Sequence, residues 1–270
     1  MEVNFEFLTI DEGKQNLLKA DTESGKIHWT KSLADYPTAR AMQRLNDDRV
    51  LMGYSRGYCI IEISTGKIIK DCARWRNVTS AYRNPDETTL ITGLNLEDQM
   101  GVCVITLDQN DEVLTTQSCE GDYVRLMTVS ENRYLLSTND HIMICNNKLK
   151  TQSILRAEGF LHAWKSIVCP DGSILVSAGY GAFMAKFNEK GVLQSTFGRA
   201  DELPPEVKPN FYASFCRIND GSILLANWQG HGVKNGSKGR QLIRFNSNGT
   251  YLNSWSFPDD ISSMQGLLIL

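Results

Sequence analysis

Two segments share one pattern: residues 171–197, DGSILVSAGYGAFMAKFNEKGVLQSTF, and residues 220–257, DGSILLANWQGHGVKNGSKGRQLIRFNSNGTYLNSWSF. Each begins with an Asp-Gly turn and an apolar strand, and continues with a strand that ends in Phe-Asn. A turn closed by glycine and another strand follow. An Asp-Gly pair supplies the positive backbone dihedral angles of a tight hairpin turn, and the flanking residues alternate as strands do. The two segments therefore predict one antiparallel meander, used twice.

Weaker copies of this unit occupy the rest of the chain. The turn before the last strand of each copy lies at Gly25, Gly66, Asp111, Asn147, Gly191 and Gly249. The intervals between these turns are 41, 45, 36, 44 and 58 residues, and 270 residues divided by six gives 45. That is the length of a four-stranded propeller blade. We therefore predict an all-β fold: a six-bladed β-propeller of four-stranded antiparallel blades, with residues 1–270 forming a single domain.

The two ends of the chain indicate how the ring closes. The last residues, ISSMQGLLIL, are typical of an innermost strand with no partners after it, whereas the N-terminus begins partway through a blade. We expect the termini to share one blade, because this closure leaves no blade edge unpaired. Seven blades are the alternative, since the first blade has room for a short extra unit.

Charge and hydropathy exclude two classes of partner. The chain has 28 basic and 31 acidic residues, a net charge of −3, and no long run of either sign. Nothing in this distribution attracts nucleic acid or an anionic lipid surface. No segment approaches the roughly 18 uninterrupted apolar residues of a membrane-spanning helix. We expect neither nucleic acid nor a membrane as a partner.

The N-terminus and the cysteines bear on the compartment. MEVNFEFLTIDEG has no basic segment, no continuous apolar segment and no small-residue cleavage site, so it does not indicate a secretory signal. Several of the seven cysteines lie in apolar runs and none forms a Cys-x-x-Cys pair, as expected for reduced thiols in the core. We expect a cytoplasmic monomer, or a periplasmic or secreted protein if a leader has been removed.

The repeats resemble those of two known propeller types. Residues 20–29, ADTESGKIHW, resemble the quinoprotein-type repeat, in which Asp, a turn Gly and Trp stand four residues apart; STGK at residues 64–67 matches its centre. The DGSIL units resemble NHL-type repeats. The resemblance covers nearly the whole chain and implies a propeller without implying one activity. Residues 227–245 and the closing SSMQG are similar to uncharacterised bacterial six-bladed propeller proteins, for which the resemblance implies no established reaction.

The resemblance also bears on cofactors. Quinone-dependent dehydrogenases of the quinoprotein superfamily are longer, have eight blades and carry a vicinal cysteine pair, which this chain lacks. We expect no pyrroloquinoline quinone and no other cofactor. The four histidines are scattered, so we expect no metal site. No Gly-x-Ser-x-Gly elbow is present, and the glycine-rich residues 230–236 only approach a dinucleotide fingerprint and open no helix.

Propeller geometry places certain loops on one rim. The loops that enter the innermost strands, and those that join the second and third strands, share this rim. Three successive blades offer an arginine in the entrance loop, and the next offers a histidine. In blade six both loops are long, at residues 197–212 and 228–239. Long loops on a rigid scaffold are where binding residues accumulate, so we expect a site at this mouth of the channel.

The predicted site combines guanidinium groups, which hold oxyanions well, with aromatic walls and imidazole groups that transfer protons near neutral pH. The alternative is that the arginines pair with neighbouring acids at a solvated rim and that the tryptophans pack between blades. The predicted ligand-binding residues are Arg40, Arg76, Arg125, Trp164, Trp228, Gln229 and Lys238. If the protein is an enzyme, the predicted catalytic residues are His162 and His231.

Three functions are compatible with these sequence features. The first is a binding propeller that recognises a small polar or anionic ligand, such as a carboxylated sugar, or a protein segment. The second is a hydrolase, lyase or transferase that uses a histidine as base and the arginines to stabilise charge. The third is a protein-interaction scaffold without a small-molecule pocket. The fold alone does not choose among them.

Overall fold

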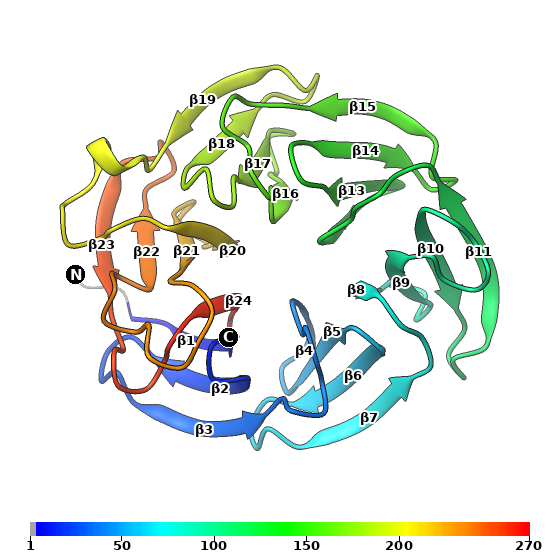
Figure 1. The fold of residues 1–270 in the computed structure, drawn as a ribbon, viewed down its shortest axis with the longest axis horizontal. Coiled ribbons are helices and arrows are strands. Elements are labelled where there is room, and N and C mark those ends of the chain that lie inside the picture. The colour runs from blue at the N-terminus through cyan, green and yellow to red at the C-terminus, as the bar shows by residue number, and fades with distance from the viewer. Residues whose placement is uncertain (1–3) are drawn as a thin grey trace.

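The computed structural model describes residues 4–270, which form six four-stranded antiparallel sheets around a central axis (Figure 1). This arrangement confirms the predicted six-bladed β-propeller. Apart from one 3-10 turn, η1 (Ala200–Glu202), the described residues contain only strands and loops.

The first three blades lie within the N-terminal half of the chain, except for one strand that comes from the C-terminus. From the innermost strand outward, their strands are β24 (Met264–Ile269), β1 (Glu6–Asp11), β2 (Asn16–Asp21) and β3 (Ile27–Ser32); β4 (Ala41–Asn46), β5 (Arg49–Tyr54), β6 (Gly57–Glu62) and β7 (Ile68–Ala73); and β8 (Val78–Arg83), β9 (Thr89–Leu94), β10 (Val102–Leu107) and β11 (Val113–Cys119).

The other three blades follow in chain order around the ring. In the same sequence, their strands are β12 (Met127–Ser130), β13 (Arg133–Ser137), β14 (Ile142–Asn146) and β15 (Thr151–Leu155); β16 (Ser166–Val168), β17 (Ile174–Ser177), β18 (Met184–Phe187) and β19 (Leu193–Phe197); and β20 (Phe211–Arg217), β21 (Ile223–Trp228), β22 (Leu242–Phe245) and β23 (Tyr251–Trp255).

The ring closes as predicted, by a blade that both chain ends share. Strand β24 pairs antiparallel with β1, with Phe7 opposite Ile269. A buried carboxylate fastens this joint: Asp11 accepts hydrogen bonds from the backbone N–H groups of Ser262 and Ser263, both at 2.8 Å. The closure therefore combines strand pairing with a charged acceptor that is completely buried.

Glycines close the turns before the outermost strands, as the repeat pattern predicts. Gly25, Gly66, Gly191 and Gly249 have φ values of 66°, 71°, 79° and 86°, in the left-handed region that favours glycine. At Gly66 there is a second constraint, because a Cβ atom there would lie 2.8 Å from the ring of Trp29 in the neighbouring blade. The tryptophan of the ADTESGKIHW motif therefore packs on the turn glycine of the next blade.

The Asp-Gly turns of the inner hairpins differ in detail from the prediction. Gly172 has a φ of 78°, whereas Asp171 does not have a positive φ. The Asp171 side chain instead accepts a hydrogen bond from the backbone N–H of Ser173 at 3.0 Å. The turn that contains Asp220 and Gly221 repeats this arrangement. The aspartate therefore acts as a hydrogen-bond acceptor within the turn, and only the glycine supplies the unusual backbone angle.

The apolar core lies between the blades. Residues of β5, β6, β9 and β10 are almost all buried, whereas the outermost strands β3 and β7 alternate between exposed and half-buried positions. Hydrophobic clusters bridge neighbouring sheets in every part of the ring. This packing holds the innermost strands at constant positions around the channel, so that the loops at their ends have a rigid support.

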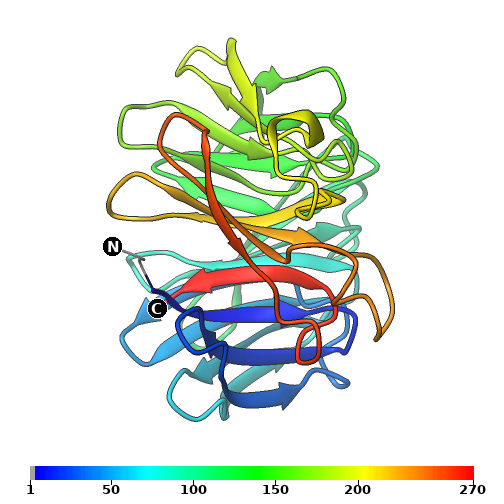
Figure 2. The ribbon, with the colours of Figure 1, turned by 90° about the vertical axis from the view of Figure 1, so that its left-hand side faces the viewer.

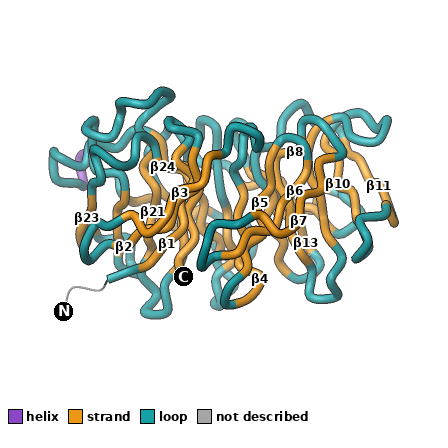
Figure 3. The backbone as a smooth tube through the Cα atoms, turned by 90° about the horizontal axis from the view of Figure 1, so that it is seen from below, coloured by secondary structure: helices purple, strands orange, loops and turns teal. Residues whose placement is uncertain are grey.

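The two rims of the ring differ. Figure 2 shows both chain ends on one rim and the loop 229–241, in orange, on the opposite rim. Figure 3 shows the strands as a belt between two layers of loops, with η1 on the side away from the N-terminus. We use the name entrance rim for the side that carries the loops entering the innermost strands and the loops joining the second and third strands.

Candidate functional site

The entrance rim brings together two arginines and a tryptophan from three blades. Arg40 directly precedes β4, Arg125 lies two residues before β12, and Trp164 lies two residues before β16. The guanidinium carbon of Arg40 is 5.5 Å from the centroid of the Trp164 ring, and that of Arg125 is 5.9 Å from it. Because blades two and five are on opposite sides of the ring, Arg40 and Trp164 meet across the mouth of the channel (Figure 1).

Neither arginine has an acidic partner. Among residues 4–270, no carboxylate lies within 4.0 Å of either guanidinium group. Arg125 is only 5% exposed; its Nη2 donates to Oδ1 of Asn139 at 2.9 Å, and its Nε has no partner among the described residues. Buried Nε1 of Trp164 likewise has none there. The mouth therefore holds two positive charges and two buried donors without acceptors.

Burial and like charge both act on these groups. Burial lowers the pKa of Arg40 and of Arg125, and the charge of Arg40 lowers the pKa of Arg125 further. Tyr123, whose ring centroid is 4.5 Å from the guanidinium carbon of Arg125, acts in the opposite direction. Burial, and then the charge of Arg125, also lowers the pKa of His162. The guanidinium groups still carry their charge near neutral pH, whereas His162 is neutral there.

An aromatic wall continues from Trp164 around the mouth. Phe211 packs edge-on against Trp164, with ring centroids 5.3 Å apart, and against Trp228 at 5.4 Å. Tyr180 covers Phe211 at 4.7 Å and contacts His162 at 5.3 Å. Tyr180 is 41% exposed, whereas Phe211 is buried. The wall therefore consists of the rings of Tyr180 and His162 at the mouth, with the buried ring of Phe211 behind Tyr180.

His231 and Glu12 form a hydrogen-bonded pair at the far end of this wall. Nδ1 of His231 lies 2.8 Å from Oε1 of Glu12, and Nε1 of Trp228 donates to Oε2 of the same carboxylate at 3.1 Å. The side chain of His231 is 77% exposed, and its ring centroid is 4.7 Å from that of Trp228. Because the Nδ1 atom is engaged by the carboxylate, Nε2 is the ring nitrogen that remains for a ligand.

Arg40 lines two neighbouring hollows of the mouth. One has a volume of about 250 Å³ and is also lined by Glu12 and His231. The other has a volume of about 440 Å³ and is also lined by Asn77 and Tyr123. Because Arg40 and His231 line the same hollow, the arginine entrance loops and the long loop of blade six lie on one rim, as propeller geometry predicts.

The long loop of blade six is held by its own hydrogen bonds. Nδ2 of Asn235 donates to the carbonyl oxygens of Gly230 and His231, both at 2.7 Å, and its backbone N–H donates to Oγ of Ser262 at 3.0 Å. A Cβ atom on Gly236 would lie 2.4 Å from the carbonyl oxygens of residues 258 and 261. The loop therefore lies tightly against the segment that leads into the closing strand.

Three of the predicted binding residues lie outside the arginine and tryptophan cluster. Gln229 is buried, and its amide donates to the backbone carbonyl of Asn227 at 3.2 Å. Lys238 and Arg76 are exposed, without an ion pair to the rest of residues 4–270. In the Arg76 loop the buried side chain is the adjacent Trp75. The structure thus groups Arg40, Arg125, Trp164 and His162, with Trp228 and His231 along the same wall.

Five residues of the mouth have no counterpart among the predicted site residues. Tyr123 lies in the same entrance loop as Arg125, and Phe211 begins β20 at the end of the long entrance loop of blade six, so that the position of both was a usable signal. The other three lie in short connections between second and third strands, where loop length attracts no attention. The five are Tyr123, Phe211, Glu12, Asn139 and Tyr180.

The described part of the chain contains neither a candidate metal site nor a candidate membrane-spanning helix. Within residues 4–270, no group of three or more His, Cys, Asp or Glu side chains is arranged to hold a metal ion. In that same range, no helix has the length and apolar character that crossing a membrane requires.

Comparisons with known proteins support the fold. No protein-family model and no curated protein sequence matches the chain. A protein of unknown function from Bacteroides caccae has a similar structure, with a TM-score of 0.82 over 99% of both chains at 17% identity. A streptogramin B lyase gives a TM-score of 0.62, at 11% identity over 98% of this chain and 90% of that one. At these identities the likeness is one of fold alone.

Proposed function

We propose that the protein binds a small ligand carrying an oxyanion group at the entrance rim, with the anion between Arg40 and Arg125. The proposal rests on the guanidinium groups of Arg40 and Arg125. Both lie beside the ring of Trp164, and neither has a carboxylate partner among residues 4–270. Buried cations are normally paired, because an unpaired charge in a partly desolvated place costs free energy. A bound anion supplies the missing partner.

The unpartnered donors support the same conclusion. Nε of Arg125 and Nε1 of Trp164 are both buried without an acceptor among the described residues. A buried donor without a partner costs about 1–3 kcal/mol. An oxyanion has several lone pairs, so one bound group satisfies donors from more than one side chain.

The surroundings indicate the rest of the ligand. Tyr123, beside Arg125, is 37% exposed, and Tyr180, on the aromatic wall, is 41% exposed. These side chains offer broad apolar faces with polar hydroxyl ends, which suit a ring that also carries hydroxyl groups. The hollows beside Arg40, at about 250 and 440 Å³, are of the size that holds a small metabolite. A carboxylated or phosphorylated sugar fits this combination.

The first test measures binding by isothermal titration calorimetry, with D-glucuronate, glucose 6-phosphate and sulfate as anionic probes and D-glucose as the neutral control. We expect at least one anion to bind and D-glucose not to bind. Arg125→Gln should weaken the anion by about tenfold or more, because a charge-assisted pair is lost. Arg76→Gln is the matched control, since Arg76 is an exposed arginine of the neighbouring entrance loop, and should leave the affinity within about twofold.

Two outcomes would contradict this function. One is that none of the three anions binds or raises the unfolding temperature of the wild-type protein. The other is that Arg76→Gln weakens binding as much as Arg125→Gln does, since the effect would then come from the general charge of the rim.

A second candidate function is favoured by the Glu12–His231 pair. A histidine whose Nδ1 is held by a carboxylate has Nε2 oriented for proton transfer, and the carboxylate stabilises the imidazolium that forms. In this function His231 removes a proton from the carbon next to the anionic group of the ligand, Glu12 orients the imidazole, and Arg40 stabilises the developing negative charge. The electron pair then forms a C=C bond as the C–O bond to the leaving group breaks, and the protonated His231 returns its proton to the departing oxygen. The streptogramin B lyase, which has the same kind of fold, makes an elimination reaction a reasonable class to test.

The catalytic test follows the anions that bind, together with streptogramin B, by mass spectrometry after long incubation. Turnover by the wild type that His231→Gln abolishes, with affinity kept within about threefold, would support an enzyme. His141→Gln is the matched control, because His141 also contacts an acidic side chain on a short loop but lies outside the mouth cluster. If neither the wild type nor a variant changes any of these ligands chemically, the function is ligand binding without catalysis.

A further inference from the structure

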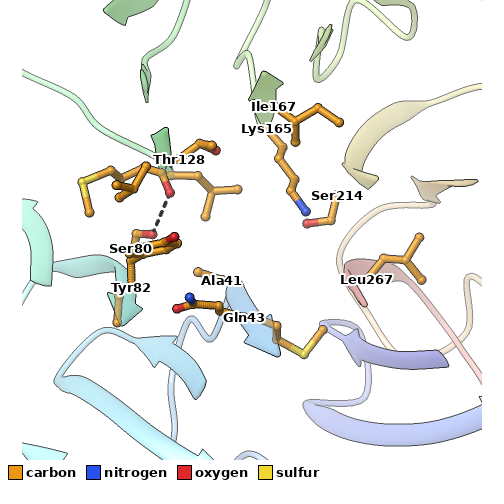
Figure 4. A pocket seen from close by; sticks show the side chains of 14 residues that line it. Ala41, Gln43, Ser80, Tyr82, Thr128, Lys165, Ile167, Ser214 and Leu267 are labelled. Atoms are coloured by element: carbon orange, nitrogen blue, oxygen red, sulfur yellow. Dashed lines mark hydrogen bonds between the residues drawn. The ribbon is translucent and has the colours of Figure 1, made fainter. Parts of the chain in front are cut away.

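A separate cavity lies on the axis of the ring, directly below the arginines. Its volume is about 150 Å³. It is lined by residues of all six innermost strands, together with Leu126 and Lys165, which directly precede β12 and β16 (Figure 4). Each group of the mouth is followed in the chain by a residue of this cavity: Arg40 by Ala41, Arg125 by Leu126, and Trp164 by Lys165. The axial cavity therefore adjoins the arginine and tryptophan cluster along three of the six innermost strands, but none of these three mouth residues lines it.

Lys165 is the one charged residue among the described residues that line this cavity. Its Nζ atom has no carboxylate within 4.0 Å and no hydrogen-bond partner in residues 4–270; the ring centroid of Phe215 lies 5.8 Å away. Figure 4 shows the ammonium group directed at the hydroxyl of Ser214 inside the cavity. The cavity therefore contains one positive charge that the protein does not compensate.

Three polar side chains of the wall, those of Gln43, Ser80 and Thr128, already form hydrogen bonds within the chain. The amide of Gln43 donates to the carbonyl oxygen of Arg83 at 2.9 Å and accepts from its N–H at 2.7 Å. The hydroxyl of Thr128 donates to the carbonyl oxygen of Ser166 at 2.6 Å. No hydrogen bond within the described residues involves the buried side chain of Ser214. Lys165, Ser214 and the half-buried Tyr82 are thus the lining residues whose polar side-chain groups have no hydrogen bond within the described residues. Of these, Ser214 is the residue toward which the Lys165 ammonium group is directed.

The rest of the wall is apolar and sets the class of ligand. Leu126, Met127, Ile167 and Leu267 line the cavity together with Lys165 and Ser214. One ammonium group compensates one negative charge, whereas a dianion such as phosphate would leave a charge unpaired among apolar side chains. A cavity of about 150 Å³ holds a molecule of about six heavy atoms, the size of benzene.

We propose that the axial cavity is a second site, distinct from the anion site of the entrance rim, and that it binds a short-chain aliphatic monocarboxylate. The carboxylate lies against the ammonium group of Lys165 and the hydroxyl of Ser214. The chain of three or four carbons lies among Leu126, Met127 and Ile167. The ligand completes the ion pair that Lys165 lacks and fills the apolar part of the channel.

The experiment uses butyrate, whose six heavy atoms match the cavity, and measures its affinity by calorimetry near pH 7. Wild-type protein should bind butyrate, while 1-butanol and phosphate should bind at least about tenfold more weakly. Lys165→Met, which keeps an unbranched chain and removes the charge, should weaken butyrate about tenfold or more. Arg40→Gln should keep butyrate affinity within about threefold, which separates this site from the anion site of the rim.

A second measurement does not depend on any variant. In wild-type protein, nuclear Overhauser effects should connect the methyl group of butyrate with the Met127 and Leu126 methyl groups. The proposal is overturned if butyrate at about 20 mM neither binds nor gives these contacts, or if a folded Lys165→Met protein binds butyrate as the wild type does. If Arg40→Gln abolishes butyrate binding while Lys165→Met preserves it, butyrate occupies the rim and the axial site is wrong.

Discussion

The long loops of blade six and the short entrance loops of blades two and four use polar side chains in opposite ways. In the long loop 229–241, backbone groups find side-chain partners in the chain itself: the carbonyl oxygen of Arg240 accepts from Nδ2 of Asn227 in β21 at 2.8 Å, and Nδ2 of Asn235 donates to two carbonyl oxygens. In the short loops, Arg40 and Arg125 have no acidic partner among residues 4–270.

This difference changes what loop length means here. A long loop has many backbone N–H and C=O groups that need partners, and in this protein its side chains largely satisfy that need. A charged side chain that is partly buried without a partner has no such structural use. The unpaired charge, and not the length of the loop, therefore marks the candidate site.

The largest expected effect concerns the closing segment on which the long loop rests. Asp11→Ala removes an acceptor from two buried N–H groups, so we expect unfolding free energy to fall by about 3–4 kcal/mol. Urea denaturation measures this loss. Asp259→Ala is the control, because Asp259 is exposed, and should change stability by less than about 0.5 kcal/mol. Equal losses would mean that the buried carboxylate has no special part in the closure.

The next effect concerns the long loop itself. Asn235→Ala should lower the unfolding free energy by about 1–2 kcal/mol, because the carbonyl oxygen of His231 loses its side-chain donor and that of Gly230 keeps only the hydroxyl of Ser263. Sulfate affinity should stay within about twofold, since Asn235 does not contact the arginines. Asn248→Ala, at an exposed turn, is the control. A large loss of sulfate affinity in Asn235→Ala would give the long loop a direct part in binding.

The third effect has the opposite sign for stability. Arg125→Gln removes a buried cation that lies near another cation, so we expect the ligand-free protein to become more stable by about 1 kcal/mol. Arg76→Gln should leave stability within about 0.5 kcal/mol. Thermal unfolding without added anions measures both. A clear loss of stability in Arg125→Gln would show that the guanidinium group serves the fold.

The smallest effect is a pH dependence at the same cluster. Burial and the charge of Arg125 lower the pKa of His162, so the unfolded state binds a proton more readily than the folded state. Stability therefore falls as pH drops through about 6.5, the unfolded value, toward the lower folded pKa. His162→Gln should flatten this part of the profile, and a bound anion should raise the pKa of His162 in a proton NMR titration. A pKa that does not move when sulfate binds would place the anion away from His162.

Much of the fold could be predicted because its pattern is local. The alternation of apolar residues, the glycine turns at Gly25, Gly66, Gly191 and Gly249, and a last strand without a following partner all lie within short segments. Ring closure by β24 and β1 then follows, since an unpaired edge would otherwise remain. The Asp-Gly turns were predicted in position and differ in geometry, because the aspartate side chain binds the backbone.

The sequence predicted the rim of the candidate site better than it predicted which residues lie together there. Arg40 directly precedes β4, Arg125 lies two residues before β12, and both guanidinium groups lie beside Trp164. In the equivalent loop of blade three, Trp75 is buried and Arg76 is exposed. Tyr180 and Glu12 lie in short connections and become neighbours of Phe211 and His231 only in the folded ring. Such choices depend on packing between blades, which a repeat pattern does not contain.

By itself, the amino-acid sequence determined the number of blades, the manner of closure and the rim that carries the entrance loops, because strand alternation and turn chemistry act over a few residues. Only the tertiary structure decided which charged groups are left without partners. Pairing between charges depends on distances between residues from different blades, such as Arg40 and Trp164, and those distances exist only once the ring has closed.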